Sequence, residues 1–193
     1  MSVKVRFAPS PTGYLHVGNV RTAMITWLFC RKAGGEFLLR IDDTDQERSE
    51  EKYVEAIKED LSWLGLNWDI TDKQSNYMND YDAAIEKLVS EGRVYACYET
   101  AEELSLKRKS LLGRGMPPIY DREGTTLTDA QKQAYEAEGR QAHYRFKLEH
   151  DPIEWDDLVR GPQNFHGKDL SDPVLVREDG RPLYTISTVV DDI

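Results

Sequence analysis

The segment Pro11–Asn19 combines two glycines with a histidine, a combination suited to binding phosphate. Gly13 and Gly18 carry no side chain, so a ligand can approach the backbone closely there. If a helix begins near Val17, its free amides and partial positive charge favour an anion at the same place. His16 can donate a hydrogen bond to a phosphate oxygen that gains charge in a transition state. The alternative is a rigid strand-to-helix turn with a capping histidine, because neither common glycine-rich nucleotide pattern is present.

Two charged residues at the ends of predicted strands extend this candidate site. Arg6 closes a strand that leads into the segment, and a guanidinium can grip a carboxylate through two parallel hydrogen bonds. Asp42 ends the next predicted strand, so both side chains are expected at the same edge of a sheet. Ser10 and the Ala8 backbone could complete a pocket between them. Arg6 could instead be a solvated charge on an edge strand.

The elements that must position these residues form a strand–helix–strand unit. Val3–Phe7 alternates apolar and basic residues and predicts a strand, which the following prolines and glycine end. Apolar residues at helical spacing from Val17 predict a helix that Gly34–Gly35 stops. Phe37–Ile41 predicts a buried strand. This order favours a parallel sheet and the α/β fold class.

The rest of the chain changes character after Cys97. The predicted elements are helices over Glu47–Leu64 and Tyr81–Ser90, a strand over Val94–Tyr98, short helices opened by capping boxes at Thr100 and Thr128, a strand over 143–148, and a hairpin of Val174–Val176 with Leu183–Ile186. We therefore predict three parts: residues 1–97, a smaller α+β unit over 98–184, and a last part over 185–193.

Composition excludes several classes of protein. The chain has 193 residues, of which 39% are hydrophobic and 31% charged, as expected for one globular domain with or without a modest insertion. No apolar run could span a bilayer, and the first residues do not form a signal stretch. Two cysteines argue against a disulfide framework and favour a reducing cytosol. A net charge of −10 argues against a general nucleic-acid coat, so contact with RNA must rest on local patches.

Several motifs in order resemble one family. His16-Val17-Gly18-Asn19 resembles the "HIGH" signature of class I aminoacyl-tRNA synthetases. The preceding Arg6–Gly13 and the later Arg40–Asp45 are similar to motifs of the glutamyl branch, and the similarity continues from Arg160–Pro162 to Val189–Asp192. The chain thus resembles the N-terminal part of glutamyl-tRNA synthetase. That resemblance implies an incomplete Rossmann-type catalytic domain, interrupted by a smaller α+β domain that binds the tRNA acceptor end.

The resemblance also implies an activity. The full-length enzyme would activate L-glutamate with ATP and Mg²⁺ to glutamyl-adenylate, then transfer the glutamyl group to the 3′ end of tRNA(Glu). We expect a cytoplasmic, monomeric enzyme that makes no contact with membranes. His16 is the implied catalytic residue. The implied ATP-binding residues are Thr12, Gly13, His16, Gly18 and Asn19, and the implied glutamate-binding residues are Arg6, Ala8, Ser10, Asp42 and Tyr184.

Three positions qualify these assignments. Asp42 stands where the glutamyl family usually carries glutamate, so the side chain is one methylene shorter and a water could fill the gap. Tyr184 could instead be a hairpin aromatic packed on the core. Thr188 stands where many relatives carry asparagine, and we assign it no ligand contact.

Some relatives hold zinc in the insertion through a Cys-x-Cys pair and a later Cys/His pair. Here Cys97 is followed by Tyr98 and Glu99, and no cysteine occurs after it. One thiolate cannot make a structural zinc site, which uses four ligands. We therefore predict no zinc, with Cys30 and Cys97 as small core residues.

Basic residues of the predicted insertion are candidate contacts for tRNA phosphates. Each could equally be a solvated charge, and only their collection on one face would favour the functional interpretation. The candidates are Lys107, Arg108, Lys109, Arg145, Lys147 and Arg160.

The second class I signature, a lysine-rich loop of the "KMSKS" type, does not occur in this sequence. We therefore expect a fragment of a longer enzyme that does not charge tRNA at a useful rate. Two alternatives stay open. One is the truncated glutamyl-Q-type paralogue that modifies a tRNA base, although such paralogues usually keep the Cys-x-Cys pattern. The other is a non-catalytic module that binds amino acid or the tRNA acceptor stem.

Overall fold

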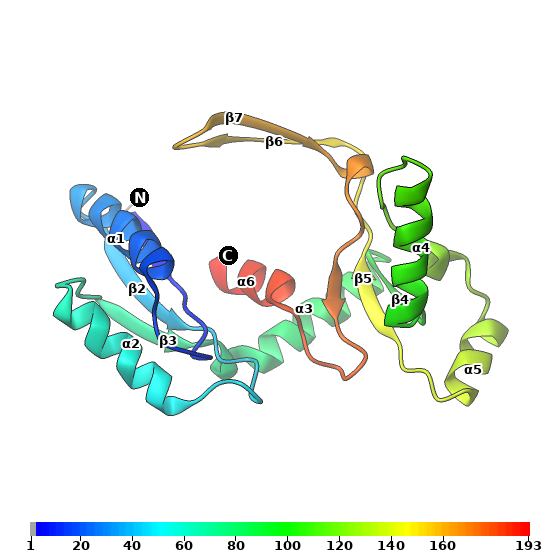
Figure 1. Ribbon diagram of the computed structural model, residues 1–193, viewed down its shortest axis with the longest axis horizontal. Helices are drawn as coiled ribbons and strands as arrows, with labels where there is room; N and C mark the ends of the chain where they lie inside the picture. Colours follow the sequence, from blue (N-terminus) through cyan, green and yellow to red (C-terminus); the bar gives the residue numbers. More distant parts are fainter. Residues whose placement is uncertain (1–2) are drawn as a thin grey trace. The chain divides into compact units, whose positions relative to one another are not determined.

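The computed structural model describes residues 3–193, which form two units divided between Asn79 and Asp80 (Figure 1). Residues 1 and 2, part of the predicted first domain, lie outside the described residues. The first unit contains a parallel sheet in the order β1-β2-β3, formed by β1 (Lys4–Phe7), β2 (Glu36–Ile41) and β3 (Ile70–Lys73). The parallel sheet confirms the predicted α/β class.

Two helices complete the core of this unit, α1 (Val17–Lys32) and α2 (Glu51–Trp63). The alternating residues Phe37, Leu39 and Ile41 of β2 share one face of the sheet and are buried. They cluster with Ala23 and Cys30 of α1 and with Val54, Ile57 and Leu61 of α2. Because both helices pack on one face of the sheet, the end of β1 and the start of α1 are held in fixed positions.

The helix α2 is shorter than the predicted Glu47–Leu64. It begins at Glu51 because the preceding residues form a turn, in which the Asp45 carbonyl accepts a hydrogen bond from the Ser49 amide at 2.9 Å. Leu64, the last residue of the predicted helix, follows the end of α2 and is 37% exposed. Gly65 follows the helix with φ of 73°, a left-handed conformation that glycine adopts without strain.

The second unit is built on an antiparallel sheet in the order β4-β5-β8. Val94, Leu175, Val176 and Ile186 form its buried core. Its helices are α3 (Met78–Ser90), α4 (Ala101–Gly113), α5 (Asp129–Ala137) and α6 (Tyr184–Asp192), of which α3 begins at the boundary between the units. Its strands are β4 (Val94–Cys97), β5 (His143–Phe146), β6 (Pro152–Asp157), β7 (Gly161–His166) and β8 (Val174–Val176). Short 3₁₀ turns cover Gln74–Tyr77, Glu123–Thr126 and Gly167–Asp169.

The predicted hairpin of Val174–Val176 with Leu183–Ile186 is wrong. Pro182 forms an isolated bridge to Val176 and the Leu183 amide donates to the Leu175 carbonyl at 2.7 Å, but the chain then enters α6. The residues of α6 have high strand propensity, but Ile186 and Val190, one helical turn apart, pack against the core of the second unit. Tertiary burial therefore outweighs the local β preference.

The division of the chain differs from the predicted boundary near Cys97. β4 pairs with β5 in the antiparallel sheet, so Val94–Cys97 belongs to the second unit rather than to the parallel sheet. Both predicted capping boxes are confirmed. Thr100 opens α4 and Thr128 opens α5, each accepting a hydrogen bond from the backbone amide three residues on.

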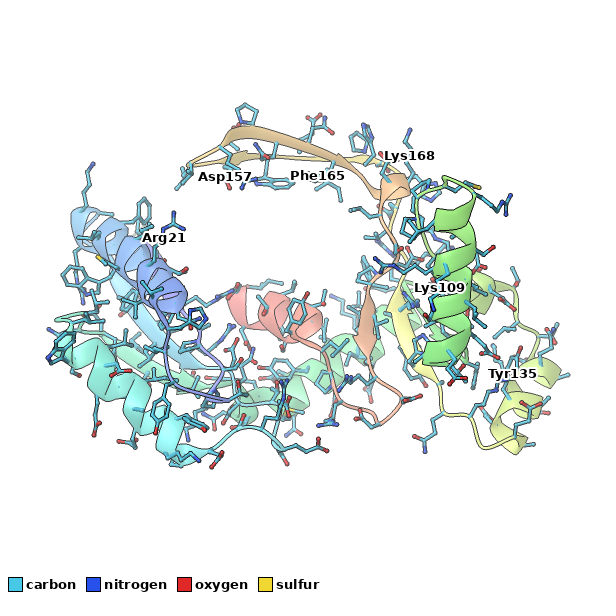
Figure 2. The ribbon with its side chains drawn as sticks, viewed as in Figure 1. Arg21, Lys109, Tyr135, Asp157, Phe165 and Lys168 are labelled. Carbon is cyan, nitrogen blue, oxygen red and sulfur yellow. The ribbon has the colours of Figure 1, made fainter. Side chains whose placement is uncertain are left out.

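β6 and β7 form a two-stranded ribbon that sequence analysis did not predict (Figures 1 and 2). The rings of Trp155 and Phe165 stack on it with centroids 5.4 Å apart. At its tip the Asp157 carboxylate accepts hydrogen bonds from the Val159 and Arg160 amides, both at 2.8 Å. In the described part of the chain, we find no helix whose length and apolar character would let it cross a membrane.

Candidate functional site

A cavity of about 520 Å³ lies beside the carboxyl end of β1 and the start of α1 in the first unit. One stretch of chain lines it, the segment that joins the two elements. The lining residues are Arg6, Phe7, Ala8, Pro9, Ser10, Thr12, Gly13, Tyr14, Leu15, His16, Asn19 and Thr22. The cavity therefore brings together most of the predicted ATP and glutamate contacts, all within one unit.

The loop that forms this cavity is held to its neighbours by backbone hydrogen bonds. The Pro9 carbonyl accepts from the Asp42 amide and the Pro11 carbonyl accepts from the Glu50 amide, both at 3.0 Å. Both prolines are buried. Because proline fixes φ and these bonds tie the loop to the end of β2 and the start of α2, the loop has little freedom to rearrange.

His16 both caps α1 and lines the cavity. Its Nδ1 accepts a hydrogen bond from the Gly18 amide at 3.0 Å, and its own amide donates to Asn19 Oδ1 at 3.3 Å. A neutral imidazole that accepts at Nδ1 carries its proton on Nε2. The cap therefore leaves His16 able to donate through Nε2. The capping interpretation and the ligand-binding interpretation of His16 are compatible in this geometry.

The two glycines of the loop have different structural roles. A Cβ added at Gly18 would lie 2.8 Å from Cε1 and 2.9 Å from Nδ1 of His16, so only glycine allows the imidazole its position. A Cβ added at Gly13 would meet nothing within 4 Å. The folded chain does not itself require glycine at position 13, but a ligand pressed against the backbone would.

Arg6 and Asp42 have different surroundings. Arg6 is half-buried and lines the cavity. Asp42 does not line it, and instead forms a two-point ion pair with Arg40, with Nε–Oδ1 at 2.7 Å and Nη2–Oδ2 at 3.1 Å. Sequence analysis missed Arg40, although an arginine inside the apolar strand Phe37–Ile41 signals a buried charge that needs a carboxylate.

Comparison with known proteins identifies the family. Residues 2–193 match the model of tRNA synthetases class I (E and Q), catalytic domain. The chain belongs to this family of class I synthetases.

Relatives of the chain are glutamate–tRNA ligases. The chain is 61% identical to that of Azospirillum brasilense over 192 residues and 57% identical to glutamate–tRNA ligase 1 of Maricaulis maris over 190 residues. It covers 43% of the length of each, so it spans less than half of these relatives. A crystal structure of the ligase from Elizabethkingia meningosepticum in complex with its amino acid superposes with a TM-score of 0.85 at 34% identity, over 100% of this chain and 42% of that one.

Tyr184, the remaining residue that the synthetase resemblance assigns to glutamate, belongs to the second unit. It is the first residue of α6, and 76% of its surface is exposed. The alternative of an aromatic packed on the core is therefore wrong, while its contact with glutamate stays a prediction.

Three of the six candidate tRNA contacts lie together and three lie apart. Lys107, Arg108 and Arg145 line a pocket of about 180 Å³ in the second unit. Lys109 is exposed on α4 (Figure 2), Lys147 is exposed just after β5, and Arg160 is exposed at the tip of the ribbon. Only Lys107, Arg108 and Arg145 therefore meet the condition that candidate tRNA contacts collect on one face.

The structure brings together three residues that could each offer one ligand to a metal ion, although their spacing in the sequence did not suggest it. Ligand atoms of Cys97, Glu99 and His143 all lie within 4.8 Å of one another. The Tyr120 hydroxyl lies 2.6 Å from a Glu99 oxygen and 3.4 Å from Cys97 Sγ. Burial raises the pKa of the Cys97 thiol to about 11, which keeps it protonated near neutral pH. Three donors of mixed type, two of them already bonded to a hydroxyl, do not fit a four-ligand structural zinc site.

Proposed function

We propose that this chain carries the glutamate- and ATP-binding part of a glutamate–tRNA ligase. The longer protein would form glutamyl-adenylate and then transfer the glutamyl group to the 3′ end of tRNA(Glu). The observation that carries the proposal is one cavity lined by both Arg6 and His16, on a chain 61% identical to a glutamate–tRNA ligase. A group that fits carboxylate and a group that fits phosphate thus share one site.

The proposed chemistry needs no nucleophilic side chain. The α-carboxylate of glutamate is itself the nucleophile, and its oxygen attacks the α-phosphorus of ATP while the bond to pyrophosphate breaks. The protein aligns the two substrates and stabilises the charge that develops on the phosphate oxygens. The Nε2–H of His16 and the positive end of the α1 dipole are suited to that task. Mg²⁺ accompanies ATP and balances part of its charge.

Arg6 would bind the side-chain carboxylate of glutamate through two parallel hydrogen bonds. Ser10 and the Ala8 backbone, which line the same cavity, would complete the contact. We assign the ammonium of glutamate to Asp42 through a bridging water, because Arg40 already occupies both carboxylate oxygens of Asp42. The resemblance to the synthetases also assigns Tyr184 to glutamate.

The second unit would hold the tRNA acceptor end, with Lys109, Lys147 and Arg160 as exposed candidates for phosphate contacts. The two cysteines are free and buried, which is compatible with a reducing cytoplasm as the place of action.

A binding experiment tests the proposal directly. Glutamyl-sulfamoyl-adenosine, a stable analogue of the adenylate, should bind the 193-residue chain more tightly than its glutaminyl counterpart in isothermal titration calorimetry. Equal affinity for the two analogues, or no binding of either, would contradict the assignment of the cavity.

A second measurement addresses catalysis by this chain alone. The sequence contains no Lys-x-Ser-Lys pattern to hold the triphosphate. We therefore expect binding without tRNA charging, and glutamyl-tRNA formed by the purified 193-residue chain would refute that expectation.

A further inference from the structure

The second unit has a pocket that the proposed activity does not use. It lies between α4 and the segment 118–121 and has a volume of about 180 Å³. It is lined by Leu104, Lys107, Arg108, Leu111, Pro118, Ile119, Tyr120, Asp121, Arg145 and Ser171. We call it the arginine pocket, because Arg108 and Arg145 give it its charge.

Arg145 is a buried cation without a carboxylate partner. It is 9% exposed, its Nη1 donates to the Asp172 backbone carbonyl at 2.7 Å, and its guanidinium lies 4.1 Å from the Tyr120 ring centroid. Among residues 3–193, no carboxylate lies within ion-pair distance of it, and its Nε has no hydrogen-bond partner. A buried charge is costly unless it is paired. An anion in the adjoining pocket would remove that cost.

The residues that line the pocket include three cations, Lys107, Arg108 and Arg145, and one carboxylate, Asp121. Lys107 pairs with Asp121 at 3.1 Å and also contacts Glu99 and Glu123, so three carboxylates surround its single positive charge. Arg108 is exposed on α4 and forms no ion pair within the described residues. Among residues 3–193, Arg108 and Arg145 are therefore the two cations of the lining without a carboxylate at ion-pair distance, in a chain whose net charge is −10.

We infer that the arginine pocket binds a terminal phosphoryl group. Two guanidinium groups match the charge of a phosphomonoester, about −1.5 to −2 at neutral pH, better than the single charge of a carboxylate or a phosphodiester. The planar guanidinium also fits phosphate oxygens in pairs. The apolar walls formed by Leu104, Leu111 and Ile119 exclude part of the solvent, which strengthens the attraction. The phosphoryl group could belong to a small phosphomonoester or to the 5′ end of an RNA.

The test is a nuclear magnetic resonance titration of the 193-residue chain with inorganic phosphate. Resonances of 104–111, 118–121 and the Arg145 side chain should shift together and saturate. The variant Arg108→Gln should weaken the binding at least tenfold, and it should fold normally because Arg108 is exposed. The matched control Arg177→Gln removes an exposed arginine outside the pocket and should change nothing. Absence of saturable shifts at the pocket, or equal effects of both variants, would overturn the inference.

A second titration distinguishes the sources of the phosphoryl group. A short acceptor-stem RNA is compared with and without its 5′ phosphate, and phosphoserine serves as the small phosphomonoester. Shifts that require the 5′ phosphate assign the pocket to an RNA end, whereas equal saturation by phosphoserine assigns it to a small molecule. Failure of all three ligands would contradict the proposal. The affinity of Arg108→Gln for glutamyl-sulfamoyl-adenosine should be unchanged, so a failure here is distinct from a failure of the proposed function.

Discussion

The two pockets of this chain are built in different ways. The cavity beside α1 is lined by one stretch of chain from Arg6 to Thr22, whereas the arginine pocket gathers α4, the segment 118–121, Arg145 of β5 and Ser171. In the first, the spacing of residues along the chain largely fixes their geometry. In the second, the geometry depends on how distant segments pack. Local patterns can therefore reveal the first site, but only a folded structure reveals the second.

The largest effect on activity is expected from substitution of His16 in the cavity beside α1. It would show that His16 has two separable roles, as the cap of α1 and as a hydrogen-bond donor through Nε2. His16→Asn keeps a good helix cap but removes the Nε2 donor. In the longer enzyme, adenylate formation should fall by about 10²- to 10³-fold, as for the loss of a donor to a developing oxyanion. The measurement is ATP–pyrophosphate exchange, with unfolding followed in parallel.

His16→Ala is the matched comparison for that variant. It should lose the same activity and in addition about 1 kcal/mol of stability, because the cap of α1 disappears. If His16→Asn retained full activity, histidine would be only a cap, and the local site would lose its proposed catalytic group.

The next effect concerns Arg6. Arg6→Ala should weaken binding of glutamyl-sulfamoyl-adenosine by about 10- to 100-fold and abolish the preference over the glutaminyl analogue, because a charge-assisted interaction is lost. Calorimetric titration measures both affinities. Lys4→Ala, an exposed cation on the same strand, is the control and should leave both unchanged. A preserved preference in Arg6→Ala would separate Arg6 from the carboxylate contact.

The two glycines give a smaller and more discriminating test. Gly13→Ala should leave thermal stability unchanged, since its methyl group meets nothing, yet it should weaken binding of the adenylate analogue. Gly18→Ala should displace the His16 ring and give a capping defect as well. Thermal unfolding and calorimetric titration of both variants distinguish the two. Unchanged affinity in Gly13→Ala would mean that no ligand lies against that part of the backbone.

The smallest effect concerns the dependence of stability on pH, through His143 of the second unit. Burial lowers the pKa of His143 below the ordinary value of about 6.5, and the Arg145 charge acts in the same direction. As pH falls below about 6.5, the unfolded chain therefore binds a proton before the folded chain does. The free energy of unfolding should then fall by at most about 1.4 kcal/mol per pH unit from this group.

His143→Gln removes that titrating group. Denaturant unfolding should be measured at several pH values between about 5 and 7. As pH falls, the free energy of unfolding should decrease less in the variant than in the parent chain. Some decrease remains in the variant, because carboxyl groups titrate in both proteins. Identical pH profiles would show that His143 is protonated as readily in the folded chain as in the unfolded one.

Sequence patterns predicted the elements whose cause is local. The strand–helix–strand unit follows from apolar spacing, and the capping boxes at Thr100 and Thr128 follow from residues three apart. Most of the cavity residues could be predicted for the same reason, because they follow one another along the chain.

The misses have non-local causes. The residues after Pro182 form a helix because Ile186 and Val190 find a core made by distant strands. Arg145 is buried because Asp172 and Tyr120 pack against it. No pattern of neighbouring residues contains that information.

The ribbon β6–β7 makes fluorescence unusually easy to interpret. The chain has four tryptophans, of which Trp27, Trp63 and Trp68 belong to the first unit. Trp155, stacked on Phe165, belongs to the second. A chain in which the other three are replaced by phenylalanine would emit from the ribbon alone. A change in that emission would report loss of the Trp155–Phe165 stack, without a contribution from tryptophans of the first unit.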